Sequence, residues 1–292
     1  MSIINTYKFI INHPLNSKNK INAVLRFIKW QIRLRISTLS IVYQFTEKSK
    51  LIVERGMTGA TGNLYCGLHE YTDMFFLLHF LRKGDLFVDI GANVGSYTVL
   101  ASAQVGASTI SVEPVPSTFS KLGQNISINQ IEKIVRPLNI ALGSEKSTLQ
   151  FTTTLDTVNH VATSQETNTI QVEVDTLENV LGIQKPILIK IDVEGFETEV
   201  MKGAEGVLLN QSLKAIIIEL NGSGERYGYD ETAIHDMLLG HGFTPCIYNP
   251  VERSVDKVEI LGLHNTIYLR DYEFVAERVK SGEKVFILNQ KI

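Results

Sequence analysis

The sequence contains very little cysteine. Cys66 and Cys246 are the only two among 292 residues, and they stand far apart with no further cysteine beside either. A disulfide framework needs paired cysteines, and a structural zinc site needs a cluster of ligands at short spacing. The sequence therefore supports neither, and it indicates isolated thiols in a reducing compartment, which predicts a cytoplasmic location.

Long uninterrupted apolar segments and internal repeats are also missing. Lysines and arginines interrupt every apolar run in the first fifty residues, so this segment resembles neither a secretory signal nor a membrane span. No repeat of solenoid length and no low-complexity tract occurs. With 44% apolar and 20% charged residues, the composition is that of an ordinary globular chain.

Charge is distributed unevenly along the chain. The net charge is -3, but residues 1–50 carry nine lysines and arginines against one acid, which leaves nineteen basic and thirty acidic residues elsewhere. We therefore divide the chain into a basic helical extension, residues 1–50, and a main domain, residues 51–292. Because the main domain is acidic and lacks a basic stripe that could follow phosphates, we expect no nucleic-acid partner.

The basic extension predicts an amphipathic helix. Its apolar residues recur at helical spacing: Ile21, Val24, Leu25, Ile28, Ile32, Ile36 and Leu39. Arg26, Lys29 and Arg33 gather on another face. Two interpretations stay open. Either the apolar face packs on the main domain and the charges are solvated, or residues 18–40 make a peripheral contact with an anionic membrane or a partner.

The main domain alternates between strand-like and helix-like segments, which predicts an α/β fold with a mostly parallel sheet covered by helices. The expected strands are Leu86–Ile90, Thr109–Glu113, Val135–Asn139, Ile187–Asp192, Ala215–Leu220, Phe243–Tyr248 and Thr266–Arg270. The expected helices are Thr72–Leu81, Tyr97–Gln104, Ser117–Asn129, Glu197–Leu208 and Glu231–Gly240. Residues 141–174 break this rhythm and predict a small β insertion with strands in "STLQFTTTL" and "NTIQVEVDTL".

A glycine-containing turn follows the first expected strand in "FVDIGANVGSYT". Asp89 and Gly91 lie where this strand ends, and Gly95 lies in the turn that enters a helix at Tyr97. Ligands of open α/β sheets bind at the carboxyl ends of the strands, and glycine lets the backbone approach them closely. Glu113 ends the second strand 22 residues after Gly91, a spacing at which an acid accepts hydrogen bonds from a ribose. These features predict a site for a ribose-bearing cofactor.

The turn departs from the dinucleotide-binding pattern. A pyrophosphate site requires G-x-G-x-x-G, but this turn lacks the middle glycine, and Asp89 would repel a phosphate. S-adenosylmethionine fits better because it has no phosphate and carries an ammonium and a sulfonium group. The alternatives are an NAD-type oxidoreductase of similar topology and a tight turn without a ligand.

Three ordered blocks, "FVDIGANVGSYT", "SVEPVPSTFSKLGQNISIN" and "IKIDVEGFETEVMKGA", followed by "IIIELN", resemble the FkbM family of S-adenosylmethionine-dependent methyltransferases. The resemblance covers roughly residues 71–270. It implies a Rossmann-like class I methyltransferase sheet of seven strands, whose last strands form an antiparallel hairpin. It also implies methyl transfer to oxygen, often on sugars or related small molecules.

The resemblance carries over to individual cofactor-binding residues. It implies that Asp89, Gly91, Asn93 and Gly95, with their neighbours Ala92 and Tyr97, line the amino-acid end of the cofactor. Glu113 is then expected on the ribose, and Asp192 is expected beside the methyl group of the cofactor. Asn139 to Ala141 occupy the adenine-facing position, with Asn139 and Ala141 as candidates.

The block "IKIDVEGFE" places ionisable residues where a parallel strand is normally apolar. Lys190, Asp192 and Glu194 fall on one side of a strand by its period of two, so Asp192 and Glu194 are expected at the mouth of the site, with Lys190 neutralising them. A carboxylate takes the proton when a hydroxyl attacks a methyl group. Asp192 is the first candidate and Glu194 the second, while Glu219 at the end of "AIIIEL" reaches the same rim. The alternative is that these acids cap helices and only shape the pocket.

Histidines and a metal ion are further candidates for this site. His69, His160 and His264 lie in expected loops, and His160 is the candidate acceptor-side base. Asp192, Glu219 and Asn221 offer oxygen ligands of the kind that Mg²⁺ accepts. The family resemblance does not require a metal, so none is expected. A non-catalytic scaffold that uses its basic helix for binding is the remaining alternative to an enzyme.

Overall fold

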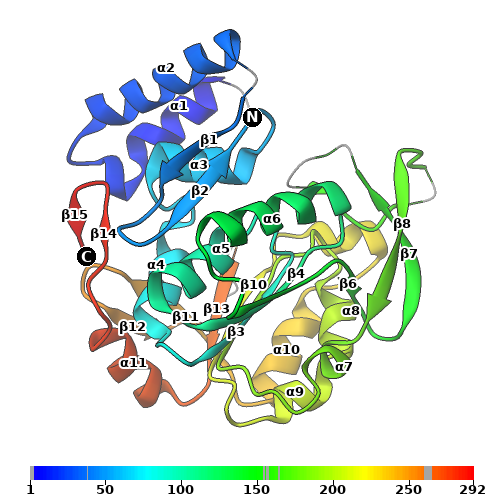
Figure 1. The fold of residues 1–292 in the computed structure, drawn as a ribbon. Helices are drawn as coiled ribbons and strands as arrows, with labels where there is room; N and C mark the ends of the chain where they lie inside the picture. The colour runs from blue at the N-terminus through cyan, green and yellow to red at the C-terminus, as the bar shows by residue number, and fades with distance from the viewer. Residues whose placement is uncertain (1–2, 38, 154, 156–157, 164, 260–264) are drawn as a thin grey trace.

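The structure is a computed structural model that describes residues 3–37, 39–153, 155, 158–163, 165–259 and 265–292. A central sheet is covered by helices on both faces, as Figure 1 shows. The N-terminal helices lie at one side of this core, and a small separate sheet projects at the other. His264 lies outside the described residues.

The central sheet has eight strands within the described ranges. In chain order they are β3 (Leu86–Ile90), β4 (Ser108–Val112), β5 (Val135–Leu138), β9 (Leu188–Ile191), β10 (Ala215–Glu219), β11 (Thr244–Asn249), β12 (Ser254–Lys257) and β13 (Asn265–Leu269). Their order across the sheet is β12-β11-β13-β10-β9-β3-β4-β5. β5, β4, β3, β9 and β10 are parallel, whereas β13 is antiparallel to both β10 and β11.

This topology confirms the expected class I sheet. The seven expected strands are present, each within one residue of its expected ends, and the last of them form the antiparallel pair β11 and β13. β12 adds an eighth strand at the β11 edge.

Alternation along the strands separates the core into two layers. Phe87 of β3 and Ile217 of β10 belong to one apolar cluster, while Val88 and Ile216, their direct neighbours in sequence, belong to the other. The first layer is completed by α4 (Tyr71–Phe80), α5 (Ser96–Val99), α6 (Pro116–Ile128) and α11 (Tyr272–Lys280). The second is completed by α7 (Leu177–Leu181), α8 (Glu197–Lys202), α9 (Glu205–Leu209) and α10 (Thr232–Gly240). Successive side chains of a strand point to opposite faces, so both faces must be apolar.

One expected helix proves to be two. The segment 197–208 forms α8 and α9, which are separated at Gly203 and Ala204. A Cβ atom on Gly203 would lie 2.0 Å from the carbonyl oxygen of Gly143, so a glycine is needed where the backbone of the insertion comes close. The prediction of one continuous helix was therefore wrong. The expected helix at 97–104 is present, with α5 continuing as a π-helix over Leu100–Val105.

The expected β insertion is confirmed as a three-stranded sheet. It consists of β6 (Ala141–Leu142), β7 (Ser147–Thr152) and β8 (Thr169–Asp175) in the order β6-β8-β7. Phe151, Val172 and Val174 form its small core, against which Phe196 and Tyr227 of the main domain pack.

The N-terminal segment is a helical pair joined to a hairpin. α1 (Ile3–Asn12) and α2 (Lys20–Ile36) lie side by side and are followed by β1 (Ile41–Gln44), β2 (Lys50–Val53) and α3 (Thr58–Cys66). Residue 50 is the first residue of β2, so the boundary expected between residues 50 and 51 falls inside this hairpin. The chain ends in a short hairpin, β14 (Phe286–Ile287) and β15 (Gln290–Lys291).

α2 packs through a different face from the one expected. The apolar residues that define the expected packing face are exposed, from 44% for Ile28 to 79% for Ile36, except Val24, which is half-buried. The opposite side instead carries Trp30 and Ala23, which are buried against α1, β2 and α3. The interpretation that the Ile28 face packs on the main domain was therefore wrong, because α2 has a second apolar side that includes its only tryptophan.

Arg26 also differs from its expected place on a solvated face. Its guanidinium donates hydrogen bonds to the carbonyl oxygen of Tyr65 and to Oδ1 of Asn16, at 2.8 and 2.6 Å from Nη2. Tyr65 belongs to the last turn of α3, whose carbonyl groups attract positive charge. Arg26 therefore holds α2 onto α3.

No helix within the described ranges has the length and apolarity that a membrane crossing requires.

Candidate active site

A cavity of about 240 Å³ opens at the carboxyl ends of β3, β4, β9 and β10. Its walls are formed by the turn after β3, the turns after β4 and β9, and the end of β10. α3, the loop that follows it and the β insertion complete the enclosure. The cavity thus lies at the place where open α/β sheets bind ligands.

The turn after β3 requires a glycine at its first position. Gly91 has φ of +76°, and a Cβ atom there would lie 1.8 Å from the carbonyl oxygen of Asp192. Ala92 and Asn93 line the cavity, and Asn93 has φ of 50°, a strained value for a residue with a side chain. Gly95 does not line the cavity. A Cβ atom at Gly95 would meet Leu122 of α6 at 2.5 Å, so it allows the close packing of α5 on α6.

Asp89 is buried at the edge of the cavity and tied to α5. One carboxylate oxygen accepts a hydrogen bond of 2.6 Å from the hydroxyl of Thr98, which also contacts the hydroxyl of Ser111. Burial raises the pKa of Asp89, and the nearby charge of Lys190 opposes the rise. Asp89 therefore anchors the first turn of the helix as well as lining the site.

Glu113 joins the turns that follow β3 and β4. Its two carboxylate oxygens accept hydrogen bonds from the backbone N–H groups of Asn93, at 3.0 Å, and Val115, at 2.9 Å. Burial outweighs these bonds and raises the pKa of Glu113 to about 7. Asn139 lies behind it and donates to the carbonyl oxygens of Glu113 and Pro114. Asn139 thus supports the loop without lining the cavity, whereas Ala141 lines it.

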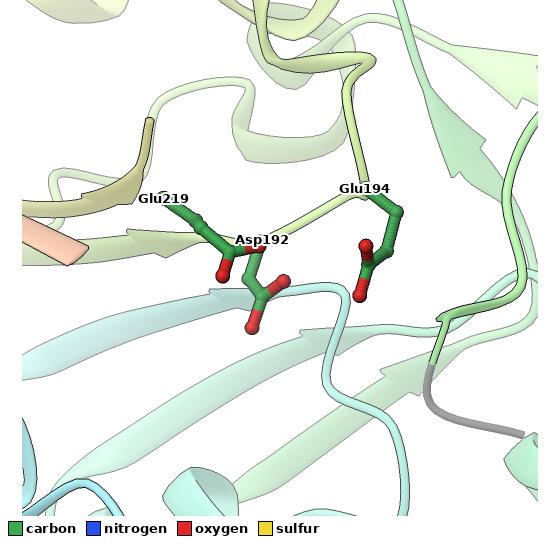
Figure 2. A group of neighbouring side chains, drawn as sticks. All are labelled: Asp192, Glu194 and Glu219. Atoms are coloured by element: carbon green, nitrogen blue, oxygen red, sulfur yellow. The ribbon is translucent and has the colours of Figure 1, made fainter. Parts of the chain in front are cut away.

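Three acids converge at the mouth of the cavity. Asp192 and Glu194 come from the segment after β9, and Glu219 is the last residue of β10. Each places a carboxylate oxygen within 4.8 Å of the others, and Figure 2 shows the three side chains directed into a common space. Glu194 has φ of 56°, again the left-handed region that side chains rarely adopt. The backbone is strained where this cluster is built.

A buried lysine lies beneath the three acids. The Nζ atom of Lys190 is 2.7 Å from Oδ2 of Asp192 and 4.7 Å from the ring centre of Tyr97. Burial alone would lower the pKa of Lys190, but the carboxylates of Asp192, Glu70 and Asp89 outweigh it and raise the pKa. Lys190 therefore stays charged and fixes the position of the Asp192 carboxylate.

The pKa values of Glu194 and Glu219 are raised to different extents. Burial and repulsion by Asp192 raise the pKa of Glu194 to about 7. Burial and repulsion by Asp192 and Glu194 raise the pKa of Glu219 well above its usual range. At neutral pH Glu219 is thus a hydrogen-bond donor, while Glu194 is poised to titrate. This arrangement is able to bind a hydroxyl group and accept its proton.

The same three carboxylates satisfy the distance requirement for a divalent cation, although no metal is expected from the sequence. Asn221, which the sequence offers beside them as an oxygen ligand, is turned to another contact. Asn221 is exposed, and its Oδ1 accepts a hydrogen bond from the backbone N–H of Ser223. Lys190 already supplies a positive charge within this cluster. The negative charge that a bound cation would neutralise is therefore already partly neutralised by Lys190.

The candidate histidines differ in position. His160 is buried within the insertion, where its Nδ1 lies 2.7 Å from the carbonyl oxygen of Val158 and its Nε2 3.1 Å from Glu166. It is not among the residues that line the cavity. His69 does line the cavity, and burial lowers its pKa, which favours the neutral ring.

Sequence reasoning missed the contribution of α3 and the start of α4. Asn63 of α3 donates to the hydroxyl of Ser96 and accepts from the backbone N–H of His69, so it ties the cavity wall to the start of α5. Glu70 lines the cavity, and Asp73 behind it has a pKa raised to about 7 by burial. No motif or periodicity marks these residues, because their place depends on packing between distant segments.

Comparisons with known proteins relate the chain to methyltransferases. Residues 89–245, more than half of the chain, match the profile of the methyltransferase FkbM domain. Hexuronic acid methyltransferase AglP of Haloferax volcanii is 30% identical over 148 residues, which cover 50% of this chain and 59% of AglP. Methyltransferase 1 of Beauveria bassiana is 31% identical over 189 residues, covering 56% of this chain and 74% of that protein.

A solved structure of methyltransferase FkbM from Methylobacillus flagellatus is 15% identical, with a TM-score of 0.44 over 75% of this chain and 56% of the other. The profile match spans the turn after β3, Glu113 and all three acids of the cluster. It favours the methyltransferase interpretation over the oxidoreductase and scaffold alternatives. The chain belongs to the FkbM family of methyltransferases.

Proposed function

We propose that this methyltransferase uses S-adenosylmethionine to methylate a hydroxyl group of a saccharide or a related small molecule. One observation carries the proposal. A single cavity brings together the glycine turn after β3, the acid that directly follows β4 and the acid cluster at the ends of β9 and β10. The first two features suit a ribose-bearing cofactor, and the third suits a hydroxyl acceptor.

The residues of the cavity fit a cationic cofactor without phosphate. Asp89, Glu113 and Asp192 all line it, and the lysine beside them is already paired with Asp192. A pyrophosphate would face this negative charge, whereas the ammonium and sulfonium of S-adenosylmethionine would be attracted by it. We place the ribose at Glu113, the amino-acid end along Asp89, Gly91, Ala92, Asn93 and Tyr97, and the adenine toward Ala141.

The cofactor supplies an electrophilic methyl group bonded to a positively charged sulfur. The chain positions the acceptor, since an in-line displacement depends on orientation. When the acceptor oxygen takes the methyl group, the neutral thioether of S-adenosylhomocysteine would be the leaving group, and the hydroxyl proton would pass to a carboxylate of the chain. We assign this role to Asp192, which Lys190 holds in place, with Glu194 as the alternative and protonated Glu219 as a donor to the acceptor.

The acid cluster favours a hydroxyl over a carboxylate as the acceptor. AglP is a hexuronic acid methyltransferase by name, and a hexuronic acid carries both groups. A carboxylate acceptor would need no base and would be repelled by Asp192 and Glu194. A hydroxyl is neutral and requires a proton acceptor at the position that these residues occupy.

The test is transfer of a labelled methyl group from S-adenosylmethionine to a panel of neutral and uronic-acid oligosaccharides. We expect labelled product that survives mild alkali, because an ether is stable where a methyl ester hydrolyses. Alkali-labile product would show methylation of a carboxylate and contradict the hydroxyl assignment.

The test variant is Asp192→Asn. Its matched control is Asp256→Asn, because Asp256 is exposed on β12 and does not line the cavity. Transfer should be lost in the first variant and retained in the second. Equal loss or equal retention in both would contradict the role given to the cluster.

A further inference from the structure

An apolar stripe on the outside of α2 has no partner within the described residues. Ile21, Leu25, Ile28, Ile32 and Ile36, which we call the outer stripe, are 44 to 79% exposed. Ile4 and Tyr7 of α1 extend it, at 66% and 44% exposed. Contiguous exposed apolar patches on a globular chain mark interaction sites.

The helix is held with this stripe facing outward. Trp30 and Ala23 on its opposite side are 4% and 0% exposed, and Arg26 is bonded to the end of α3. The outer stripe is thus the surface of a packed helix. It is preformed, and no rearrangement is needed to present it.

Basic residues flank the outer stripe on both sides. By the helical period, Lys20 and Arg35 lie along one edge of the stripe, and Lys29 and Arg33 lie along the other. All four are exposed. Residues 1–46 contain no aspartate or glutamate, so nothing acidic in the segment offsets them.

We propose that the α1–α2 pair docks flat on an anionic membrane surface through the outer stripe. The apolar side chains would enter the boundary between headgroups and acyl chains, and the flanking lysines and arginines would reach the anionic headgroups. A second copy of the chain would bring the same basic edges together across a two-fold axis, which like-charge repulsion opposes. Charge complementarity therefore selects an anionic lipid surface as the occupant.

Docking would place the membrane one helix away from the cavity. The inner side of α2 packs on α3, and Thr58, Gly59 and Asn63 of α3 line the cavity. The docking surface on α2 and the cavity are therefore connected through α3 alone. The proposal stands on the exposed stripe and its charges, so it does not depend on the identity of the cofactor or the acceptor.

The test is co-sedimentation of the full chain with two kinds of vesicle, phosphatidylcholine alone and phosphatidylcholine mixed with phosphatidylglycerol. We expect binding to the mixed vesicles that weakens as salt is added, because screening shortens the reach of the charges. Ile28→Ser with Ile32→Ser, and separately Lys29→Gln with Arg33→Gln, should each weaken binding roughly tenfold or more. The matched control is Ile183→Ser with Ile247→Ser, two isoleucines that are 96% and 59% exposed elsewhere.

Three results would contradict the membrane proposal. A chain that stays in the supernatant with mixed vesicles at low salt would overturn the proposal, and so would equal binding by the stripe variant and its control. Sedimentation velocity without lipid tests the second-copy alternative. A dimer that the Ile28→Ser, Ile32→Ser variant dissociates would show that the stripe joins two chains, and the membrane proposal would fall.

Discussion

Asp192 is the residue at which the turn after β3 and the acid cluster meet. Its backbone carbonyl oxygen lies against Gly91, and its carboxylate is paired with buried Lys190 and neighbours Glu194 and Glu219. A carboxylate held in this way can act on an acceptor proton without moving. Its effect on catalysis can therefore be separated from its effect on cofactor binding.

Replacing Asp192 by asparagine should lower kcat roughly a hundredfold or more, because general base catalysis contributes about that much. Binding of S-adenosylmethionine should change only a few-fold, since Gly91 and Glu113 are intact. Lys190 would lose one partner but would still face Asp89 and Glu70, so the variant should fold. Steady-state kinetics and calorimetry measure the two effects. Unchanged kcat would remove Asp192 from the chemistry.

The sequence identified the residues of the site that belong to short motifs. Asp89 is the penultimate residue of β3, and Gly91, Glu113 and Asp192 directly follow the ends of β3, β4 and β9. All four line the cavity. The place of His160 could not be predicted from the sequence. A buried histidine that contacts Val158 and Glu166 cannot be distinguished, by sequence alone, from a histidine in a loop that acts as a base.

At the scale of elements, the turn after β3 is built around a close approach that glycine alone permits. The Asp192 carbonyl occupies the space where a side chain at Gly91 would begin. Gly84, in the turn before β3, also has positive φ, at +88°, but a Cβ atom there would meet nothing within 4 Å. A side chain at Gly84 would therefore meet only backbone strain, whereas a side chain at Gly91 would meet both backbone strain and steric overlap.

Gly91→Ala should abolish cofactor binding and destabilise the fold by at least about 2 kcal/mol, since both strain and overlap oppose it. Gly84→Ala should cost only about 1 kcal/mol and leave binding intact. Urea denaturation and calorimetry provide the comparison. Equal effects in the two variants would show that the contact between Gly91 and Asp192 has no special role.

The two sides of α2 should respond differently to truncation. Trp30→Ala removes a buried ring and should lower the free energy of unfolding by about 3 to 5 kcal/mol. Ile32→Ala lies on the outer stripe, where the change should stay within about 0.5 kcal/mol. Circular dichroism during urea denaturation measures both. A larger loss for Ile32→Ala would mean that the outer stripe, and not the Trp30 side, packs on the domain.

Helix periodicity alone could not decide this orientation. The stripe from Ile21 to Ile36 is the more regular one, but Trp30, Phe27 and Ala23 form the side that fits α1 and α3. Likewise, the break at Gly203 depends on the approach of Gly143, sixty residues earlier in the chain. The strands were found because short buried runs of apolar residues are local features.

At the scale of the whole molecule, buried titratable groups link stability to pH. Burial raises the pKa of Glu113, Glu194 and Glu197 from 4.5 to about 7. In the interval between these values the folded state holds protons that the unfolded chain has released, so the carboxyls make stability fall as pH rises. Burial lowers the pKa of His13 and His79 from 6.5 to about 4, which has the opposite effect, but only below about pH 6.5.

The protein without ligand should therefore lose stability as pH rises from about 6.5 to about 8, where only the carboxyls still titrate. Thermal unfolding at constant ionic strength tests this. Glu194→Gln removes one of these groups and should show a smaller drop in Tm, whereas Glu173→Gln, at an exposed site on β8, should follow the parent chain. A Tm that rises over this interval would contradict the assignment of protonated acids.

Chelation of divalent cations should leave methyl transfer unchanged, because Lys190 and the proton on Glu219 already balance the acid cluster. Activity measured before and after treatment with a chelator, and after addition of Mg²⁺, provides the test. Loss with the chelator and recovery with Mg²⁺ would assign the cluster to a metal.

The most direct test of the central claim is calorimetric titration of the purified chain with S-adenosylmethionine and S-adenosylhomocysteine, beside Glu113→Gln and the control Glu173→Gln. We expect micromolar binding of both ligands by the parent and the control, and binding weakened at least tenfold in Glu113→Gln, because a ribose hydroxyl would lose a carboxylate oxygen that accepts its hydrogen bond. The absence of binding by the parent chain, or undiminished binding by Glu113→Gln, would contradict the cofactor site described here.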